Sequence, residues 1–90
     1  MVPTKLVFML KPRTNNHRDD VDQIQQAIIS TAEQFPSVRP DGRDALHVVL
    51  VQADNTYVVN LSVVCLTHAD IAPFSGAVLR ALRTSGFEDV

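Results

Sequence analysis

The segment LHVVLVQADNTYVVNLSVVCL, from Leu46 to Leu66, decides the fold that we expect. Apolar residues alternate with other residues along its two halves, which is the period of a β-strand with one buried face. Asp54 and Asn55 separate the halves, and both residue types tolerate the backbone angles of a two-residue hairpin turn. The segment is therefore predicted to form an antiparallel β-hairpin.

A two-residue turn at Asp54–Asn55 would fix the partners across this hairpin. One face is almost wholly apolar, and its predicted pairs are Leu46 with Val63, Val48 with Leu61, Leu50 with Val59, and Gln52 with Tyr57. We expect this face to pack against helices. The predicted pairs of the opposite face are His47 with Ser62, Val49 with Asn60, and Val51 with Val58. A slip of one residue would exchange the two faces, so burial of the apolar face selects which side chains enter the core.

Two elements are predicted before the hairpin. The run KLVFMLK, from Lys5 to Lys11, is typical of a buried strand. Between Asp19 and Phe35, apolar residues recur at spacings of three and four, which predicts an amphipathic helix capped by Asn15 or Asn16. Pro36 ends this helix, because the residue before a proline avoids helical angles. The segment SVRPDGRDA that follows is predicted to be a loop with a turn at its Pro-Asp-Gly.

A second helix and the start of a strand are predicted after the hairpin. The sequence THAD, from Thr67 to Asp70, has the form of a helix capping box. The main helix is expected to begin near Pro73 and to run to Thr84, with Gly86 as its stop. The final FEDV would begin another strand. This order predicts one α+β domain over residues 1–90, a ferredoxin-like split βαββαβ sandwich with a truncated last strand.

Composition narrows the range of functions. A hydrophobic content of 46% in 90 residues is that of one small globular domain. The net charge is −2 and the eight basic residues are scattered, whereas nucleic-acid binding would need a basic stripe. No apolar run approaches the ~20 residues that span a bilayer. The single cysteine, Cys65, cannot form an internal disulfide, which fits either a reducing compartment or a protein that is indifferent to redox conditions. We therefore expect a cytoplasmic protein that binds no nucleic acid and does not span a membrane.

No arrangement of residues for catalysis emerges. His17, His47 and His68 are separated in the chain and lack the further ligands that a metal site needs. Cys65 belongs to the set predicted to face the core, where a thiol is inert. The glycines are too far apart for a phosphate-binding loop. We expect no enzyme, cofactor or metal. Arg39 and Arg43 lie in a charged loop that could grip an anion or a small ligand.

The face of the sheet away from the helices is unusually apolar. An RNA-recognition domain of this topology stacks bases on aromatic side chains of that face, and no aromatic residue falls there. A contiguous apolar surface on a small domain usually marks a protein contact. The first strand would also be an exposed edge, because the last strand is so short. The predicted interface comprises Val7, Met9, Val49, Val51, Val58, Asn60 and Val64.

The chain resembles the cytosolic α/β domain of MscS-type small-conductance mechanosensitive channels. The similar pieces are the strand KLVFMLKP, the helix DDVDQIQQAIISTAEQFPSV, the strand TYVVNLSVVCL and the final LRALRTSGFEDV. The resemblance implies a ferredoxin-like domain whose role is to pack beside copies of itself. It implies no catalytic residues. The pore helix and β-domain of those channels are absent, so the resemblance implies an excised domain or a free-standing relative.

Three functional hypotheses follow. The first is a non-enzymatic domain that acts through self-association or by docking to a protein partner. The second is a regulatory module that binds a small ligand at a dimer interface, with loops such as VRPDGRD. The third is an enzyme of acylphosphatase-like topology, which would need an anion-binding arginine beside the first loop, where Arg13 and Arg18 lie.

Overall fold

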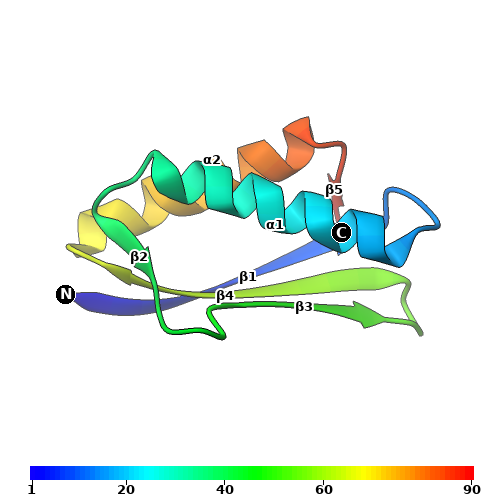
Figure 1. The fold of residues 1–90 in the computed structure, drawn as a ribbon, viewed down its shortest axis with the longest axis horizontal. Coiled ribbons are helices and arrows are strands. Elements are labelled where there is room, and N and C mark those ends of the chain that lie inside the picture. The colour runs from blue at the N-terminus through cyan, green and yellow to red at the C-terminus, as the bar shows by residue number, and fades with distance from the viewer.

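The computed structural model describes residues 1–90 and shows an α+β sandwich (Figure 1). A five-stranded antiparallel sheet forms one layer, and two α-helices cover one of its faces. The elements in chain order are β1 (Val2–Lys11), α1 (His17–Glu33), β2 (Val38–Pro40), β3 (Leu46–Val51), β4 (Thr56–Cys65), the 3₁₀ turn η1 (His68–Asp70), α2 (Ile71–Thr84) and β5 (Glu88–Asp89).

The two longest strands, β1 and β4, lie side by side in the middle of the sheet. They pair antiparallel from Val2 opposite Cys65 to Leu10 opposite Tyr57. On the far side of β4, both β2 and β3 pair with it, at different points along its length. On the far side of β1, only β5 pairs, opposite Leu10 and Lys11. Most of the outer edge of β1 therefore has no neighbouring strand, as the sequence predicted.

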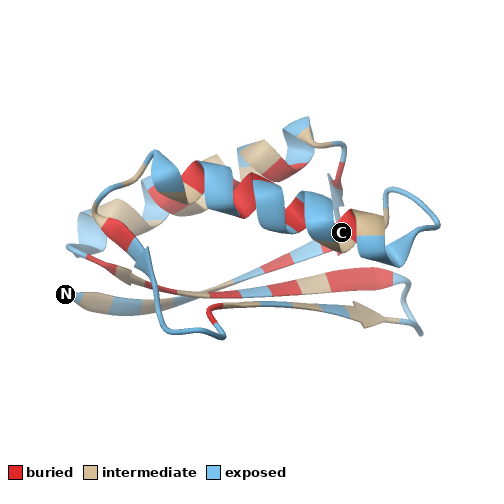
Figure 2. Cartoon of the chain, in the orientation of Figure 1, coloured by how far each residue is buried: buried red, intermediate tan, exposed pale blue.

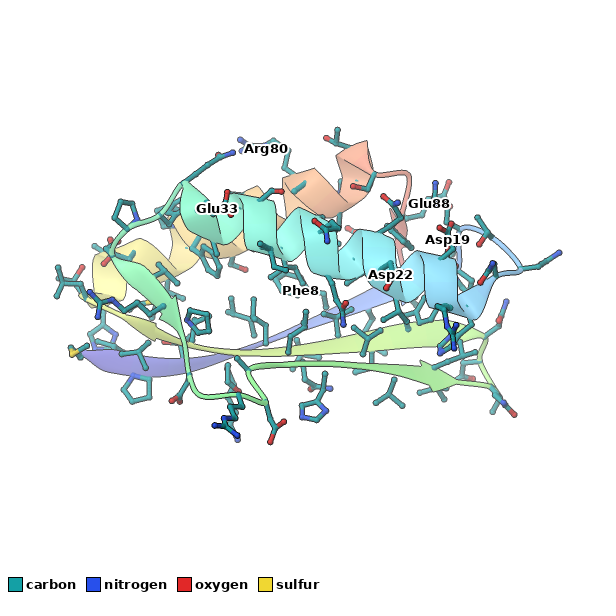
Figure 3. All side chains as sticks on the ribbon, viewed as in Figure 1. Phe8, Asp19, Asp22, Glu33, Arg80 and Glu88 are labelled. Carbon is teal, nitrogen blue, oxygen red and sulfur yellow. The ribbon has the colours of Figure 1, made fainter.

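The core lies between the sheet and the helices. Leu10, Tyr57, Val59 and Phe74 are almost completely buried there. Buried positions appear on the helix surfaces that face the sheet, and exposed positions lie on the outer surfaces (Figure 2). Phe8 is directed into the space between the sheet and α1 (Figure 3). The predicted core face of the hairpin and the apolar stripe of α1 are both confirmed by this burial.

Local signals fix the helix ends. The Asn16 side chain accepts a hydrogen bond from the Asp19 backbone N–H at 3.1 Å, so Asn16 is the N-cap of α1. At the end of α2, the Phe87 N–H donates to the Leu82 carbonyl at 3.1 Å and the Gly86 N–H to Arg83 at 3.0 Å, which is a Schellman motif. Gly86 has a φ of 98°, a left-handed angle that favours glycine. The chain reverses here and brings β5 to β1.

The predicted loop after α1 is wrong in part, because Val38–Pro40 form the strand β2. Val38 lies opposite Cys65 and Pro40 opposite Val63. The next residues leave the sheet and return, because the Ser62 carbonyl accepts from the Asp41 N–H at 2.9 Å and the Ser62 N–H donates to the Ala45 carbonyl at 2.7 Å. The edge beside β4 is thus one interrupted path made of β2 and β3.

The predicted hairpin register is also wrong, by two residues. Val48 lies opposite Val59 instead of Leu61, and Val49 lies opposite Val58 instead of Asn60. The turn contains the four residues Gln52–Asn55, with Asn55 at a φ of 50°. A slip of two residues keeps every side chain on its face, so apolar patterning does not distinguish the two registers.

The burial of one hairpin face predicts a clear difference between two neighbouring residues. Leu61→Ala should lower the free energy of unfolding by about 2–5 kcal/mol, because it removes buried methyl groups from the core. Ser62→Ala should change it by less than about 0.5 kcal/mol, since the Ser62 side chain is only half-buried and bonds to nothing. Denaturant melts of the two variants measure the difference, and equal losses would contradict the assigned faces.

Candidate functional site

The sheet face opposite the helices has no element over it, and side chains project freely from it (Figure 3). Apolar side chains form a continuous row across three strands here. Val58 of β4 lies opposite Met9 of β1 on one side and opposite Val49 of β3 on the other. Met9 is 52% exposed and Val49 is 51% exposed. The period-two alternation of the strands places these three residues on the same face.

Val7 and Val51 extend this row into a patch. Val7 is two residues from Met9 along β1, on the same face, and is 60% exposed. Val51 is two residues from Val49 along β3 and lies opposite Thr56 instead of Val58, which corrects the predicted partner. We call the residues Val7, Met9, Val49, Val51 and Val58 the open-face patch. They belong to three strands that are far apart in the sequence.

The other two residues of the predicted interface lie apart from this patch. Asn60 lies between Val7 and His47 in the register, so it begins a polar row next to the patch. Val64 is farther along β4, opposite Pro3 and Arg39, and is half-buried. The structure therefore brings five of the seven predicted residues together, with Asn60 at their border and Val64 at the other end of the face.

A shallow hollow of about 410 Å³ lies over the polar row. Lys5, His47, Asn60 and Ser62 supply its polar lining. Lys5 lies opposite Ser62, and no carboxylate lies within 4.0 Å of its amine. The cation at the end of the same strand, Lys11, forms an ion pair with Glu88 of β5 at 4.0 Å. The open face thus combines an apolar patch with an unpaired cation.

The two arginines of the predicted anion loop are not brought into one pocket. Arg39 lies on β2 and lines a hollow of about 170 Å³ with Val64 and Leu66. Arg43 lies in the excursion between β2 and β3, next to Gly42, and is exposed. Neither arginine forms an ion pair with a carboxylate.

A buried polar cluster that the sequence did not predict lies at the start of α1. Asp20 is completely buried, and its Oδ2 accepts hydrogen bonds from the backbone N–H groups of Arg13 and Thr14, both at 3.2 Å. The Thr14 hydroxyl donates to Oδ1 at 2.9 Å. The Tyr57 hydroxyl donates to Oδ2 at 3.1 Å. These bonds tie the β1–α1 loop and the first turn of α1 to strand β4.

His17 completes the cluster. Its ring stacks on Tyr57 with centroids 5.4 Å apart, and its Nδ1 lies 3.2 Å from the Tyr57 hydroxyl. The one hydroxyl hydrogen goes to Asp20, so His17 Nδ1 must carry the hydrogen of this second bond. His17 is the first residue of α1 and is exposed, so it lies at the solvent side of the cluster.

The environment of the cluster shifts the pKa values of its acidic groups. Burial raises the pKa of Asp20, but the hydrogen bonds from Thr14, Tyr57 and Arg13 outweigh it, and the pKa lies below the usual 3.8. Burial, together with the hydrogen bond and the negative charge of Asp20, raises the pKa of Tyr57 to about 12. A carboxylate that already accepts four hydrogen bonds is a poor base, and a hydroxyl whose pKa is so high is a poor acid. The cluster is therefore suited to anchoring and ill suited to proton transfer.

Arg13 is held in place by the same cluster. Its guanidinium donates to Asp19 at 3.1 Å, its Nε lies 3.8 Å from Asp20, and its charged group lies 5.6 Å from the ring centre of Phe87. An arginine bound in this way is not free to cradle an anion as an acylphosphatase-like site would require. Arg18 is exposed.

Three further observations concern metal binding, the cysteine and membrane crossing. No group of three or more His, Cys, Asp or Glu side chains is arranged to hold a metal ion. Cys65 is fully buried, as predicted from its place on the core face of β4. None of the helices has the length and apolar character needed to cross a membrane.

Comparisons with protein-family models, with curated proteins and with solved structures found no match to this chain.

The buried cluster predicts an unusual titration of Tyr57, which is the only tyrosine in the chain. A pKa that is raised in the folded state favours folding below the ordinary value of 10.0, and this contribution is lost as the pH rises through about 12. Tyrosinate absorbance of the folded protein should therefore rise near pH 12. In Asp20→Asn the midpoint should fall toward 10.0, because the negative charge is gone.

Asp22→Asn is the matched control, because Asp22 lies on the same helix and is exposed. It should leave the Tyr57 titration unchanged. Far-ultraviolet circular dichroism must be recorded at each pH to identify unfolding. A wild-type midpoint near 10.0 with an unchanged dichroism spectrum would show that the Asp20–Tyr57 contact does not form.

Proposed function

We propose that the protein is a non-enzymatic docking domain that self-associates through the open-face patch. The observation that carries this proposal is the exposure of Val7, Met9 and Val49, each more than half exposed, on a surface that no helix covers. Val58 lies between Met9 and Val49 and joins them into one apolar row. Such contiguous apolar surface on a small domain is costly to leave in water and usually marks a contact.

The size of the open face is sufficient for a dimer. β1 and β4 contain 10 residues each, so each extends about 33 Å at about 3.3 Å per residue. β3 contains 6 residues and extends about 20 Å, so three strands at a spacing of about 4.8 Å give a projected area of roughly 400 Å². A corrugated surface exceeds its projection, so two copies would bury about 800–1,000 Å² in total. That area is at the lower bound for a specific interface.

A second copy of the chain is the partner that suits the patch. The five patch residues carry no charge, so a two-fold arrangement can place one patch on another without burying an unpaired ion. Two sheets pack face to face about 10 Å apart when both inner faces are apolar. Asn60 and His47, at the border of the patch, would then lie at the rim, where polar groups remain hydrated.

The ferredoxin-like arrangement is part of the proposal. If β2 and β3 are taken as one interrupted strand, the order across the sheet is that edge, then β4, β1 and β5, which agrees with a split βαββαβ unit. The resemblance to the cytosolic domain of MscS-type channels leads to the same expectation of packing beside copies, and we propose a cytoplasmic location on that basis.

A ligand-binding regulatory module is the second candidate. One observation favours it: an apolar cavity of about 100 Å³ between α1 and the interrupted edge, next to Arg39 and Pro40. Its walls include Ile28, Ala45 and Phe74. A metabolite bound there would sit beside the predicted ligand loop. This candidate requires assembly that depends on added metabolite, whereas the first requires assembly of the protein alone.

The self-association proposal predicts that charge in the patch dissociates the assembly. In Val49→Glu, Val58→Glu, two carboxylates lie opposite each other on neighbouring strands and would be desolvated in the interface. We expect the dissociation constant to rise at least about 100-fold, which is about 3 kcal/mol. Light scattering after size exclusion measures the assembly, and circular dichroism should show an unchanged fold.

The matched control adds the same charge elsewhere. Gln25→Glu, Gln26→Glu places two carboxylates on the exposed side of α1, away from the open face, and should leave the assembly intact. If the patch variant stays associated, the patch is not the interface. If both variants dissociate equally, net charge governs the association and the patch has no specific role.

A further inference from the structure

The free edge of β1 presents backbone groups that bond to nothing in the structure. Ser62, opposite Lys5, uses both its N–H and its carbonyl on Asp41 and Ala45, on the other side of β4. In an antiparallel pair, the backbone groups of Lys5 must then point away from β4, toward the outer edge. The Val90 N–H donates to the Met9 carbonyl at 3.1 Å from that outer side, which agrees with this alternation.

The same alternation applies to Pro3 and Val7, two residues either side of Lys5. The outer edge between them therefore offers two N–H donors, from Lys5 and Val7, and three carbonyl acceptors. Such a row of unpaired groups is a template for another strand. Pro3 has no N–H, and it is tolerated at this position because that group would have faced outward.

Strand β5 shows which chemistry this edge accepts. It adds to the end of β1 with Glu88 opposite Lys11, and the two side chains form an ion pair. Farther along the edge, Lys5 has the same orientation on the open face and no carboxylate within 4.0 Å. Its neighbours are apolar: Val7 is exposed on the open face and Leu6 is half-buried on the core face.

We propose that the edge of β1 from Pro3 to Val7 binds an extended segment of a partner protein by antiparallel strand addition, with a carboxylate side chain opposite Lys5 and apolar side chains opposite Leu6 and Val7. Main-chain hydrogen bonds supply affinity in this mode, and the alternate side chains supply specificity. The site shares Val7 with the open-face patch, but it differs from the patch in using the backbone groups of the strand edge.

A second copy of β1 suits this edge less well. The β1 sequence VPTKLVFMLK contains two lysines and no carboxylate. A two-fold pairing of two such edges therefore leaves Lys5 without a counter-charge and brings like charges closer, which is destabilising across strands. Lysine on an edge discourages uncharged strands as well. Lys5 thus selects for a strand that carries a negative charge.

The test uses a synthetic peptide, acetyl-Thr-Val-Ile-Glu-Thr-Thr-amide, whose Val, Ile and Glu fall opposite Val7, Leu6 and Lys5 in the antiparallel register. A fluorescent label at one end allows titration by anisotropy. The matched control peptide has Lys in place of Glu. We expect the Glu peptide to bind about tenfold more tightly than the Lys peptide, since attraction across the strands is replaced by repulsion.

Protein variants separate the two parts of the site. Lys5→Glu should reverse the preference between the peptides. Val7→Pro should weaken both peptides at least about tenfold, because it removes an outward N–H donor without touching the bonds between β1 and β4. Val7→Thr keeps that donor and should bind the Glu peptide as the wild type does. Circular dichroism checks that the proline variant is folded. If that variant does not fold, the reversed peptide preference of Lys5→Glu is the test of the site.

Binding that is the same for both peptides, or no binding of the Glu peptide at about 1 mM, would overturn the proposal. Lys5→Pro also removes an outward N–H but changes no residue of the open-face patch. If Lys5→Pro abolished self-association while no peptide bound, a second copy of β1 would be the occupant, and the proposal would be wrong. Val49→Glu, Val58→Glu should still bind the Glu peptide. The edge and the open-face patch can therefore fail independently.

Discussion

The antiparallel pairing of β1 with β4 is the constraint on which the rest of the structure depends. It fixes Leu10 opposite Tyr57 at one end and Val2 opposite Cys65 at the other. Because successive side chains alternate, this one register sends Phe8 and Leu10 to the core together with the alternate residues of β4. It leaves Val7 and Met9 beside Asn60 and Val58 on the open side. The helices then cover one face only, and the apolar surface of the other face follows from the same pairing.

The hydrogen bond between Asp20 of α1 and Tyr57 of β4 joins the helix layer to the sheet. A buried carboxylate is costly unless every lone pair is used, and four hydrogen bonds from the β1–α1 loop and from β4 satisfy this one. Arg13 links the same point to Phe87, and therefore to the turn that brings β5 against β1. This contact therefore fixes the position of β5, and of the neighbouring edge of β1, relative to the core. The polar groups of this cluster hold elements in position and are not arranged for catalysis.

The sequence was sufficient to predict which face the residues of β1, β3 and β4 occupy, because burial follows a period of two. It also predicted the Asn16 cap of α1 and the end of α2 at Thr84. The predicted start of α2 near Pro73 is wrong, because the helix begins at Ile71, directly after the turn at His68–Asp70. The sequence was not sufficient for the hairpin register, since a shift of two residues preserves both faces. Strand β2 was missed because Pro40, Asp41 and Gly42 are typical of a turn, although the turn begins only after Pro40. Asp20 was not predicted to be buried, yet it lies four residues before Ile24 on the buried stripe of α1, and that spacing was the signal for a buried carboxylate. Five residues of the predicted interface do form one surface.

The open-face patch and the β1 edge offer two different kinds of contact, one through side chains and one through the backbone. The central claim is that the patch brings two copies together. Sedimentation equilibrium of the wild-type protein over a range of concentrations tests this claim most directly, because it requires no variant and no ligand. The account predicts a mass that rises from the 9.9 kDa of one chain toward twice that value as the concentration increases. A mass that stays at 9.9 kDa up to millimolar concentration would contradict it.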